Sequence, residues 1–160
     1  YYNDYNEQFK TDTLEAFVKT LVDADGNYLI DGIGFQAHLY TKDSLDQYFK
    51  TVDQLSALGL KIQLTELDVC LGKYQYPSIA SAKTYAIQGR FVYELIEGLF
   101  KRIDAGTLKM DALTYWGFAD AMSWRREYHP SLFDNNMKAK NAFYAAAQMK
   151  ELSGYDYPEE

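Results

Sequence analysis

Short apolar runs typical of strands alternate along the chain with amphipathic runs typical of helices, and this alternation constrains the fold most. Strands are indicated at 30–35, 61–64 and 112–115, and helices at about 11–24, 44–58, from after Pro77 to Gly106, and 138–152. Strands joined by crossover helices run parallel. We therefore expect one α/β domain over residues 1–160 with no internal boundary, because no low-complexity linker interrupts the chain. Periodicity alone fits an α/β barrel and a small doubly wound sheet equally well.

Polar and aromatic side chains follow each predicted strand. They are Gln36 and His38, Glu66 and Asp68, and Trp116 and Asp120. Side chains two apart on a strand point to the same side, so we expect Glu66 and Asp68 to project together. The loops after the strands are long and the turns before them are short, as at the functional face of an α/β barrel.

Composition excludes several classes of function. The net charge of −7 and the isoelectric point near 4.8 argue against nucleic-acid binding, which needs a basic surface. No apolar run reaches the ~20 residues of a membrane helix. Two histidines and one cysteine form no metal-binding pattern, and we expect neither a metal nor a cofactor. We interpret Cys70 as a small packed residue rather than a nucleophile. A glycine-rich phosphate loop and a serine-hydrolase motif are absent from the sequence.

Five segments resemble glycoside hydrolase family 10, the endo-β-1,4-xylanases. They are 2–6 (YNDYN), 30–39 (IDGIGFQAHL), 64–69 (LTELDV), 116–125 (WGFADAMSWR) and 130–134 (PSLFD). They occur in the order of the family and cover nearly the whole chain; Ala119 stands where the family often has Thr or Val. The resemblance implies the C-terminal half, about strands 5–8, of a TIM (β/α)8 barrel of ~250 residues or more. It also implies that the acid/base glutamate lies outside this chain.

The resemblance assigns catalytic roles to three residues. Glu66 matches the nucleophile of a retaining glycosidase, which needs a second carboxylate ~5–5.5 Å away as acid and base. His38 is expected to hydrogen-bond Glu66 and so keep it ionised, while Asp68 orients the imidazole. From spacing alone, Glu66 and Asp68 could equally be surface acids at a strand end. The second histidine, His129, is expected to be structural.

Six further residues are candidates for substrate binding. They are Gln36, Trp116, Trp124, Tyr2, Asn6 and Arg125. Apolar sugar faces pack well on indole rings, whose N–H can reach a hydroxyl, although core packing would explain both tryptophans as well. Tyr2 is a candidate for stacking a sugar on the leaving-group side. Asp120 is as suited to bracing its loop as to touching substrate.

The resulting expectation is part of a retaining endo-1,4-β-xylanase that hydrolyses xylan by double displacement, with xylan or xylooligosaccharides as substrates. We expect an extracellular, periplasmic or cell-surface location, with the signal peptide outside this chain. The isolated chain should be inactive and should pair with the N-terminal half of the same barrel or self-associate through its exposed strand edges. The alternatives are a non-catalytic polysaccharide-binding or assembly half-barrel, or a related β-1,4-glucanase.

Overall fold

The computed structural model describes residues 1–158, and these divide into two compact units. The first unit contains residues 1–37, 44–67 and 101–114, and the second contains 38–43, 68–100 and the chain from 115 onward. Because the segments of the two units alternate along the chain, no single point in the sequence separates them. The fold of each unit is given by itself.

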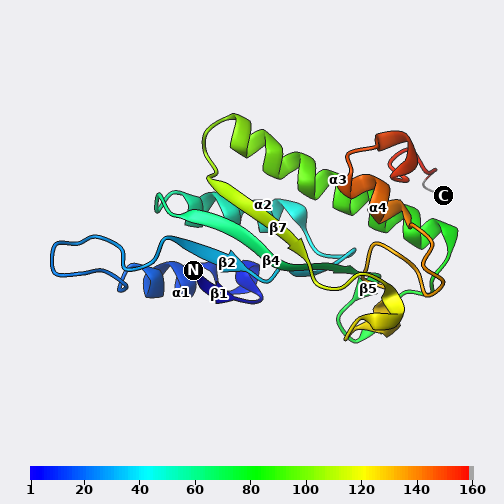
Figure 1. The fold of residues 1–160 in the computed structure, drawn as a ribbon, viewed down its shortest axis with the longest axis horizontal. Coiled ribbons are helices and arrows are strands. Elements are labelled where there is room, and N and C mark those ends of the chain that lie inside the picture. The colour runs from blue at the N-terminus through cyan, green and yellow to red at the C-terminus, as the bar shows by residue number, and fades with distance from the viewer. Residues whose placement is uncertain (159–160) are drawn as a thin grey trace. The chain divides into compact units, whose positions relative to one another are not determined.

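A parallel sheet forms the centre of the first unit (Figure 1). Strand β1 (Tyr2–Asp4) pairs with β2 (Gly32–Phe35), and β2 pairs with the first half of β4 (Lys61–Cys70). Strand β7 (Met110–Tyr115) lies on the other side of β4. In the register, Asn3 is opposite Gly34, which is opposite Gln63. The alternation in the sequence therefore does produce a parallel sheet.

Helices cover the sheet of the first unit. They are the 3₁₀ helix η1 (Glu7–Phe9), α1 (Thr11–Val18) and α2 (Leu45–Ser56). The Ser44 side chain caps α2 by accepting a hydrogen bond from the Gln47 N–H at 3.2 Å. Aliphatic and aromatic side chains from strands and helices form the core of this unit: Leu14, Val18, Ile33, Phe35, Tyr48, Val52, Leu55, Ile62 and Leu64. Their removal from water is the main stabilising contribution to this unit.

The second unit begins with β3 (His38–Tyr40), which pairs in parallel with residues 68–70 of β4, so that His38 is opposite Asp68. Its further elements are β5 (Gly72–Lys73), β6 (Tyr76–Pro77), residues 82–100 of α3 (Ala82–Asp104), η2 (Asp120–Met122), η3 (Arg126–Tyr128), α4 (Asn141–Ala146) and η4 (Lys150–Leu152). Leu95 and Val92 of α3 are fully buried in its core.

All three predicted strands differ in their bounds: β2 begins at Gly32 rather than residue 30, β7 begins at Met110 rather than residue 112, and β4 is longer than predicted. Strand β4 continues from Lys61 to Cys70, so Glu66 and Asp68 lie within the strand rather than after it. Conversely, Gln36 and His38 do not share a strand, because β2 ends at Phe35 and β3 begins at His38. The break is at Ala37, whose φ of 59° is left-handed and whose N–H donates to Glu7 Oε1 at 3.3 Å. Positive φ is costly for alanine and persists only where surrounding contacts enforce it.

Two helices are shorter than predicted. Helix α1 ends at Val18 instead of about residue 24, and the Thr20 hydroxyl donates to the Phe17 carbonyl at 2.7 Å, a side-chain bond that competes with helix continuation. The predicted helix 138–152 is reduced to α4 and the 3₁₀ helix η4. Gln148, with φ of 57°, separates them. In both cases local backbone geometry overrides an apolar periodicity that extends further.

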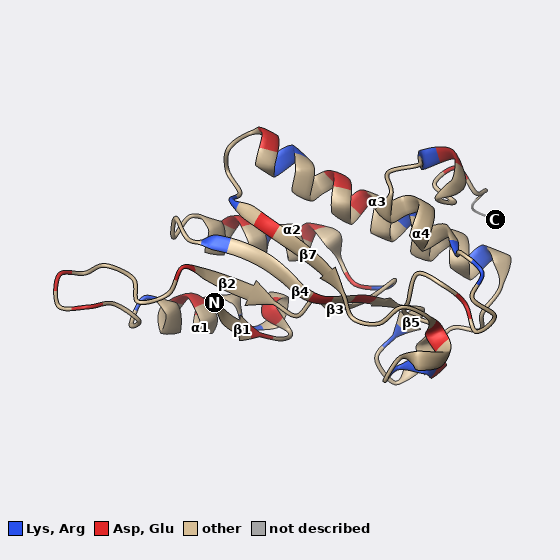
Figure 2. Ribbon diagram, in the orientation of Figure 1, with Lys and Arg blue, Asp and Glu red and all other residues tan. Residues whose placement is uncertain are grey.

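Charge along the chain is mixed in sign. In Figure 2, acidic and basic segments alternate along α3, which contains Lys83, Arg90, Glu94, Glu97, Lys101 and Arg102. Among the described residues, no helix has the length and apolarity needed to cross a membrane. No cluster of three or more His, Cys, Asp or Glu residues suited to a metal ion occurs within residues 1–158.

Candidate active site

Glu66 is positioned in the first unit by contacts from β1. Asn3 Nδ2 donates to Glu66 Oε1 at 3.4 Å, and the Thr65 hydroxyl donates to Asn3 Oδ1 at 2.7 Å. The close approach depends on Gly34, because a Cβ atom there would lie 2.6 Å from Asn3 Oδ1. Asn3 was not among the site residues expected from the sequence. The only available signal was its place in the YNDYN segment.

Successive side chains of β1 point to opposite faces of the sheet, so Asn3 points to the other face than its neighbours Tyr2 and Asp4. Tyr2 donates its hydroxyl to Asp4 at 2.9 Å, and its ring packs 4.9 Å from that of Phe17 in α1. The structure therefore brings Asn3, not Tyr2, to Glu66.

Asn6 is exposed in a left-handed turn with φ of 55°, and its carbonyl accepts the Phe9 N–H. Gln36 is half-buried, and its backbone N–H donates to the Asp4 carbonyl at 2.9 Å. Substrate contacts of Tyr2, Asn6 and Gln36 stay predictions.

His38, Asp68 and Trp124 come together in the second unit. His38 Nδ1 lies 3.0 Å from Asp68 Oδ2, and both side chains are almost fully buried. Trp124 Nε1 donates to the same oxygen at 3.1 Å, and the Trp124 ring centre lies 5.0 Å from that of His38. The indole N–H that we expected to reach a sugar hydroxyl is thus engaged by Asp68. Whether His38 also reaches Glu66 stays a prediction.

Both tryptophan candidates are accessible to a ligand. Trp116 follows β7 and is 47% exposed, and Trp124 is 57% exposed. Both can therefore offer ring surface to a sugar. Arg125 is half-buried beside Trp124. Their contacts with substrate stay predictions.

Cys70 is a packed thiol, in agreement with its interpretation from the sequence. Its side chain is fully buried, and burial, reinforced by the nearby charge of Asp68, raises the pKa of the thiol to about 12. A thiol that stays protonated at neutral pH is a poor nucleophile. Cys70 therefore has a structural role.

Asp120 braces its loop. The side chain is fully buried, and both carboxylate oxygens accept hydrogen bonds from Lys140 Nζ at 3.1 Å, while Oδ1 also accepts the Ser131 N–H at 2.8 Å. Lys140 Nζ donates in addition to the carbonyls of His129 and Ser131. His129 Nδ1 lies 3.4 Å from Asp120 Oδ2, so this histidine belongs to the same brace. The brace connects the loop that carries Trp116 and Trp124 to residues 129–131 and to the start of α4.

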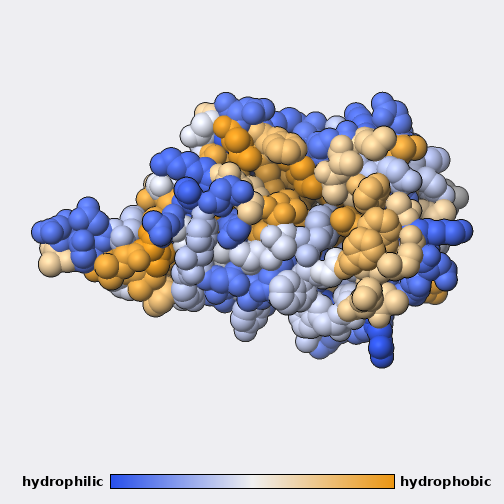
Figure 3. Space-filling model, in the orientation of Figure 1, coloured by the Kyte–Doolittle hydropathy of each residue, from blue (hydrophilic) through white to orange (hydrophobic). Residues whose placement is uncertain are grey.

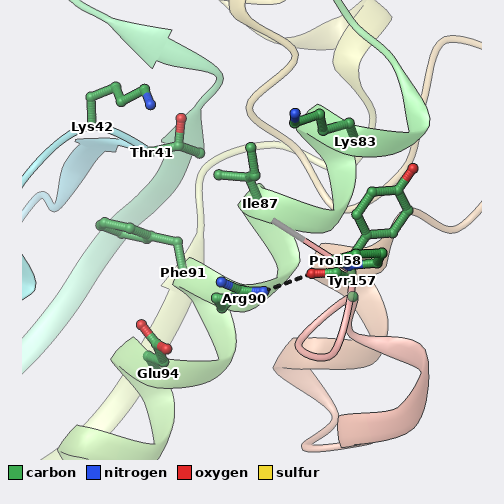
Figure 4. A pocket seen from close by; sticks show the side chains of 10 residues that line it. Thr41, Lys42, Lys83, Ile87, Arg90, Phe91, Glu94, Tyr157 and Pro158 are labelled. Atoms are coloured by element: carbon green, nitrogen blue, oxygen red, sulfur yellow. Dashed lines mark hydrogen bonds between the residues drawn. The ribbon is translucent and has the colours of Figure 1, made fainter. Parts of the chain in front are cut away.

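A cavity of about 440 Å³ lies elsewhere in the second unit (Figure 4). It is lined by Thr41, Lys42, Lys83, Ile87, Arg90, Phe91, Glu94, Gly154, Tyr157 and Pro158. Arg90 donates to the carbonyls of Tyr155 and Tyr157 at 3.0 Å and so fastens the C-terminal segment to α3. With one carboxylate among its described lining residues, the cavity lacks the acid pair of a glycosidase. We therefore do not assign the chemistry to it.

Comparison with known proteins shows the family of the chain. The family model "Glycosyl hydrolase family 10" matches residues 1–149. The chain is 33% identical over 145 residues to endo-1,4-beta-xylanase A of Thermoanaerobacterium saccharolyticum, covering 90% of this chain and 12% of that protein. It is 32% identical over 147 residues to exoglucanase XynX of Acetivibrio thermocellus, covering 91% of this chain and 12% of that protein.

A solved structure agrees with the sequence relatives. The intracellular xylanase of Thermoanaerobacterium saccharolyticum, a mutant form in complex with xylotetraose, superposes with a TM-score of 0.74 at 29% identity. The match covers 89% of this chain and 42% of the solved chain. The present chain thus spans less than half the length of these relatives. Its parallel strands and crossover helices are part of a (β/α)8 barrel.

Proposed function

This chain belongs to glycosyl hydrolase family 10, and from that premise we propose that it is part of a retaining endo-1,4-β-xylanase with Glu66 as nucleophile. The position of Glu66 carries the proposal. It lies on β4, where the Asn3 amide donates to Oε1. The hydrogen bond from the Asn3 amide restricts the orientation of the carboxylate that would attack the sugar.

The proposed reaction is a double displacement. In the first step, a Glu66 oxygen attacks the anomeric carbon while a second carboxyl group protonates the leaving oxygen. In the second step, that second group, now a carboxylate, acts as base and water hydrolyses the glycosyl–enzyme ester. We propose that the second carboxylate comes from strands of the barrel outside residues 1–160. Two successive inversions of configuration give net retention at the anomeric carbon.

His38 and Asp68 have supporting roles in this proposal. Asp68 Oδ2 lies 3.0 Å from His38 Nδ1 and so restricts the orientation of the imidazole. A carboxylate that fixes the orientation of an imidazole in this way is a recurrent device in active sites. We propose that His38 and Asp68 hold Glu66 in the orientation needed for attack.

The proposed substrate is xylan or xylooligosaccharides, because relatives described as xylanases are similar to the chain over most of its length. A β-1,4-glucanase is the second candidate, since one relative of similar identity is described as an exoglucanase. Trp116 and Trp124 suit either substrate, because both sugars have apolar ring faces.

An extracellular location stays a proposal, and the solved relative is described as intracellular.

We also propose that the remaining strands of the barrel pair with this chain, with self-association of the isolated chain as the alternative. Large apolar side chains stay exposed in this chain, and Figure 3 shows hydrophobic residues at the surface. They include Phe9 at 74%, Phe100 at 50%, Phe118 at 55% and Met122 at 73%. Exposed apolar groups of this size favour burial by a partner surface.

The stereochemistry of the first product tests the proposed function. The complete protein that contains this chain is incubated with xylotetraose, and proton NMR follows the anomeric signals before mutarotation. We expect the β-anomer to appear first, because double displacement retains configuration. Initial formation of the α-anomer would refute the mechanism. Faster cleavage of cellotetraose than of xylotetraose would select the glucanase.

A further inference from the structure

The guanidinium of Arg125 contacts the side chains of Trp124, Tyr40 and Cys70. Its guanidinium carbon lies 4.2 Å from the centre of the Trp124 ring and 5.4 Å from that of Tyr40. Arg125 Nη1 donates to the Tyr40 hydroxyl at 3.1 Å. Tyr40 is 8% exposed, and Arg125 is half-buried. The guanidinium is therefore partly removed from water, and cation–π contacts are stronger when the cation is desolvated.

Trp124 connects this pair to the predicted catalytic residues. Its ring meets the guanidinium, and its Nε1–H donates to Asp68 Oδ2, the oxygen that also lies 3.0 Å from His38 Nδ1. The orientation of the indole decides whether its N–H reaches that oxygen. A continuous set of contacts thus runs from Tyr40 through Arg125 and Trp124 to Asp68, entirely within the second unit.

We infer that Arg125 and Tyr40 are positioning residues that set the orientation of Trp124 and, through it, of Asp68. This assignment differs from the direct contact with substrate expected for Arg125 from the sequence. A planar guanidinium stacks on an indole while donating sideways, which a lysine ammonium cannot do. The role in catalysis rests on the proposed function, whereas the orientation of Trp124 does not.

The test uses two variants and one matched control in the complete protein. Arg125→Met removes the charge and the flat contact, and Tyr40→Phe removes only the acceptor hydroxyl. Arg126→Met is the control, because Arg126 is the neighbouring arginine and is exposed. Each protein is labelled with 5-fluorotryptophan, and the fluorine resonance that disappears in Trp124→Phe is assigned to Trp124. Values of kcat and KM are measured on xylotetraose with the unlabelled proteins.

We expect the Trp124 resonance to move or broaden in both variants and to stay unchanged in the control. We also expect kcat to fall about tenfold in Arg125→Met and about threefold in Tyr40→Phe, with KM changed less than about twofold. A higher KM with kcat and the resonance unchanged in Arg125→Met would mean that Arg125 binds substrate directly, and would overturn the inference. So would a Tyr40→Phe protein identical to the wild type in resonance and kcat.

The two claims can fail separately. If the wild-type protein does not hydrolyse xylotetraose, the proposed function fails, while the fluorine spectra still decide whether Arg125 and Tyr40 orient Trp124. If Arg125→Met does not fold, Tyr40→Phe decides the inference alone, because losing one hydroxyl leaves the aromatic packing intact.

Discussion

Replacement of Glu66 by alanine in the complete protein should lower kcat about a thousandfold or more on an activated aryl xylobioside. The expected loss is large because the variant lacks the atom that forms the covalent bond to the sugar. Folding should change little, since Glu66 is half-exposed and the hydrogen bond that it accepts from Asn3 is long, at 3.4 Å. The measurement is steady-state kinetics, with circular dichroism to compare the folds.

Glu151→Ala is the matched control for this prediction. Glu151 lies in η4 and is exposed. We expect wild-type kinetics from it, because removing an exposed carboxylate from a surface turn seldom changes activity. Retention of more than about a tenth of the wild-type kcat by Glu66→Ala would show that another residue is the nucleophile.

Replacement of Asp120 by alanine should lower the free energy of unfolding by about 3–5 kcal/mol, measured by urea denaturation of the complete protein. The substitution leaves the buried ammonium of Lys140 without its carboxylate partner. It also leaves the Ser131 N–H without an acceptor. Burial already lowers the pKa of Lys140 to about 8, even though the charge of Asp120 acts in the opposite direction. The ammonium therefore depends on Asp120.

The double variant Asp120→Ala/Lys140→Met tests the cause of this loss. It should recover much of the stability, because no buried charge remains, and a double-mutant cycle measures the coupling.

The folded pKa of Lys140 lies below its ordinary value of 10.5, so the unfolded chain binds more protons between these two values. Relative to Lys140→Met, the wild-type protein should accordingly gain stability as the pH rises from about 8 to about 10.5. Equal stability of Asp120→Ala and the wild type would contradict the assignment of Asp120 as a brace.

The parallel arrangement of the strands was predictable from the sequence because it follows from the order of apolar runs. The short motifs placed Glu66, Asp68 and His38 just after predicted strands, and the structure puts His38 opposite Asp68 on the paired strands β3 and β4. The break between β2 and β3 was not predictable, because the positive φ of Ala37 is supported by Glu7, thirty residues earlier in the sequence. Local sequence does not encode such a contact.

Side-chain partners were harder to predict than strands. Asn3 and Glu66 are 63 positions apart in the sequence, and Tyr40 and Arg125 are 85 apart. The side chain of Lys140 is almost fully buried against Asp120, although lysine side chains are rarely buried. These contacts depend on the tertiary fold, so only the structure could assign Asp120 to bracing its loop.

Covalent trapping of the nucleophile tests the central claim most directly. The complete protein is incubated with a 2-deoxy-2-fluoroxylobioside that carries a good leaving group, because the fluorine slows hydrolysis of the glycosyl–enzyme more than it prevents its formation. Intact-mass spectrometry and peptide mapping then locate the adduct. We predict one fluoroxylobiosyl group, attached to Glu66 and absent from Glu66→Ala. Attachment to another carboxylate, or turnover of unmodified xylotetraose with inversion and no adduct, would contradict the account.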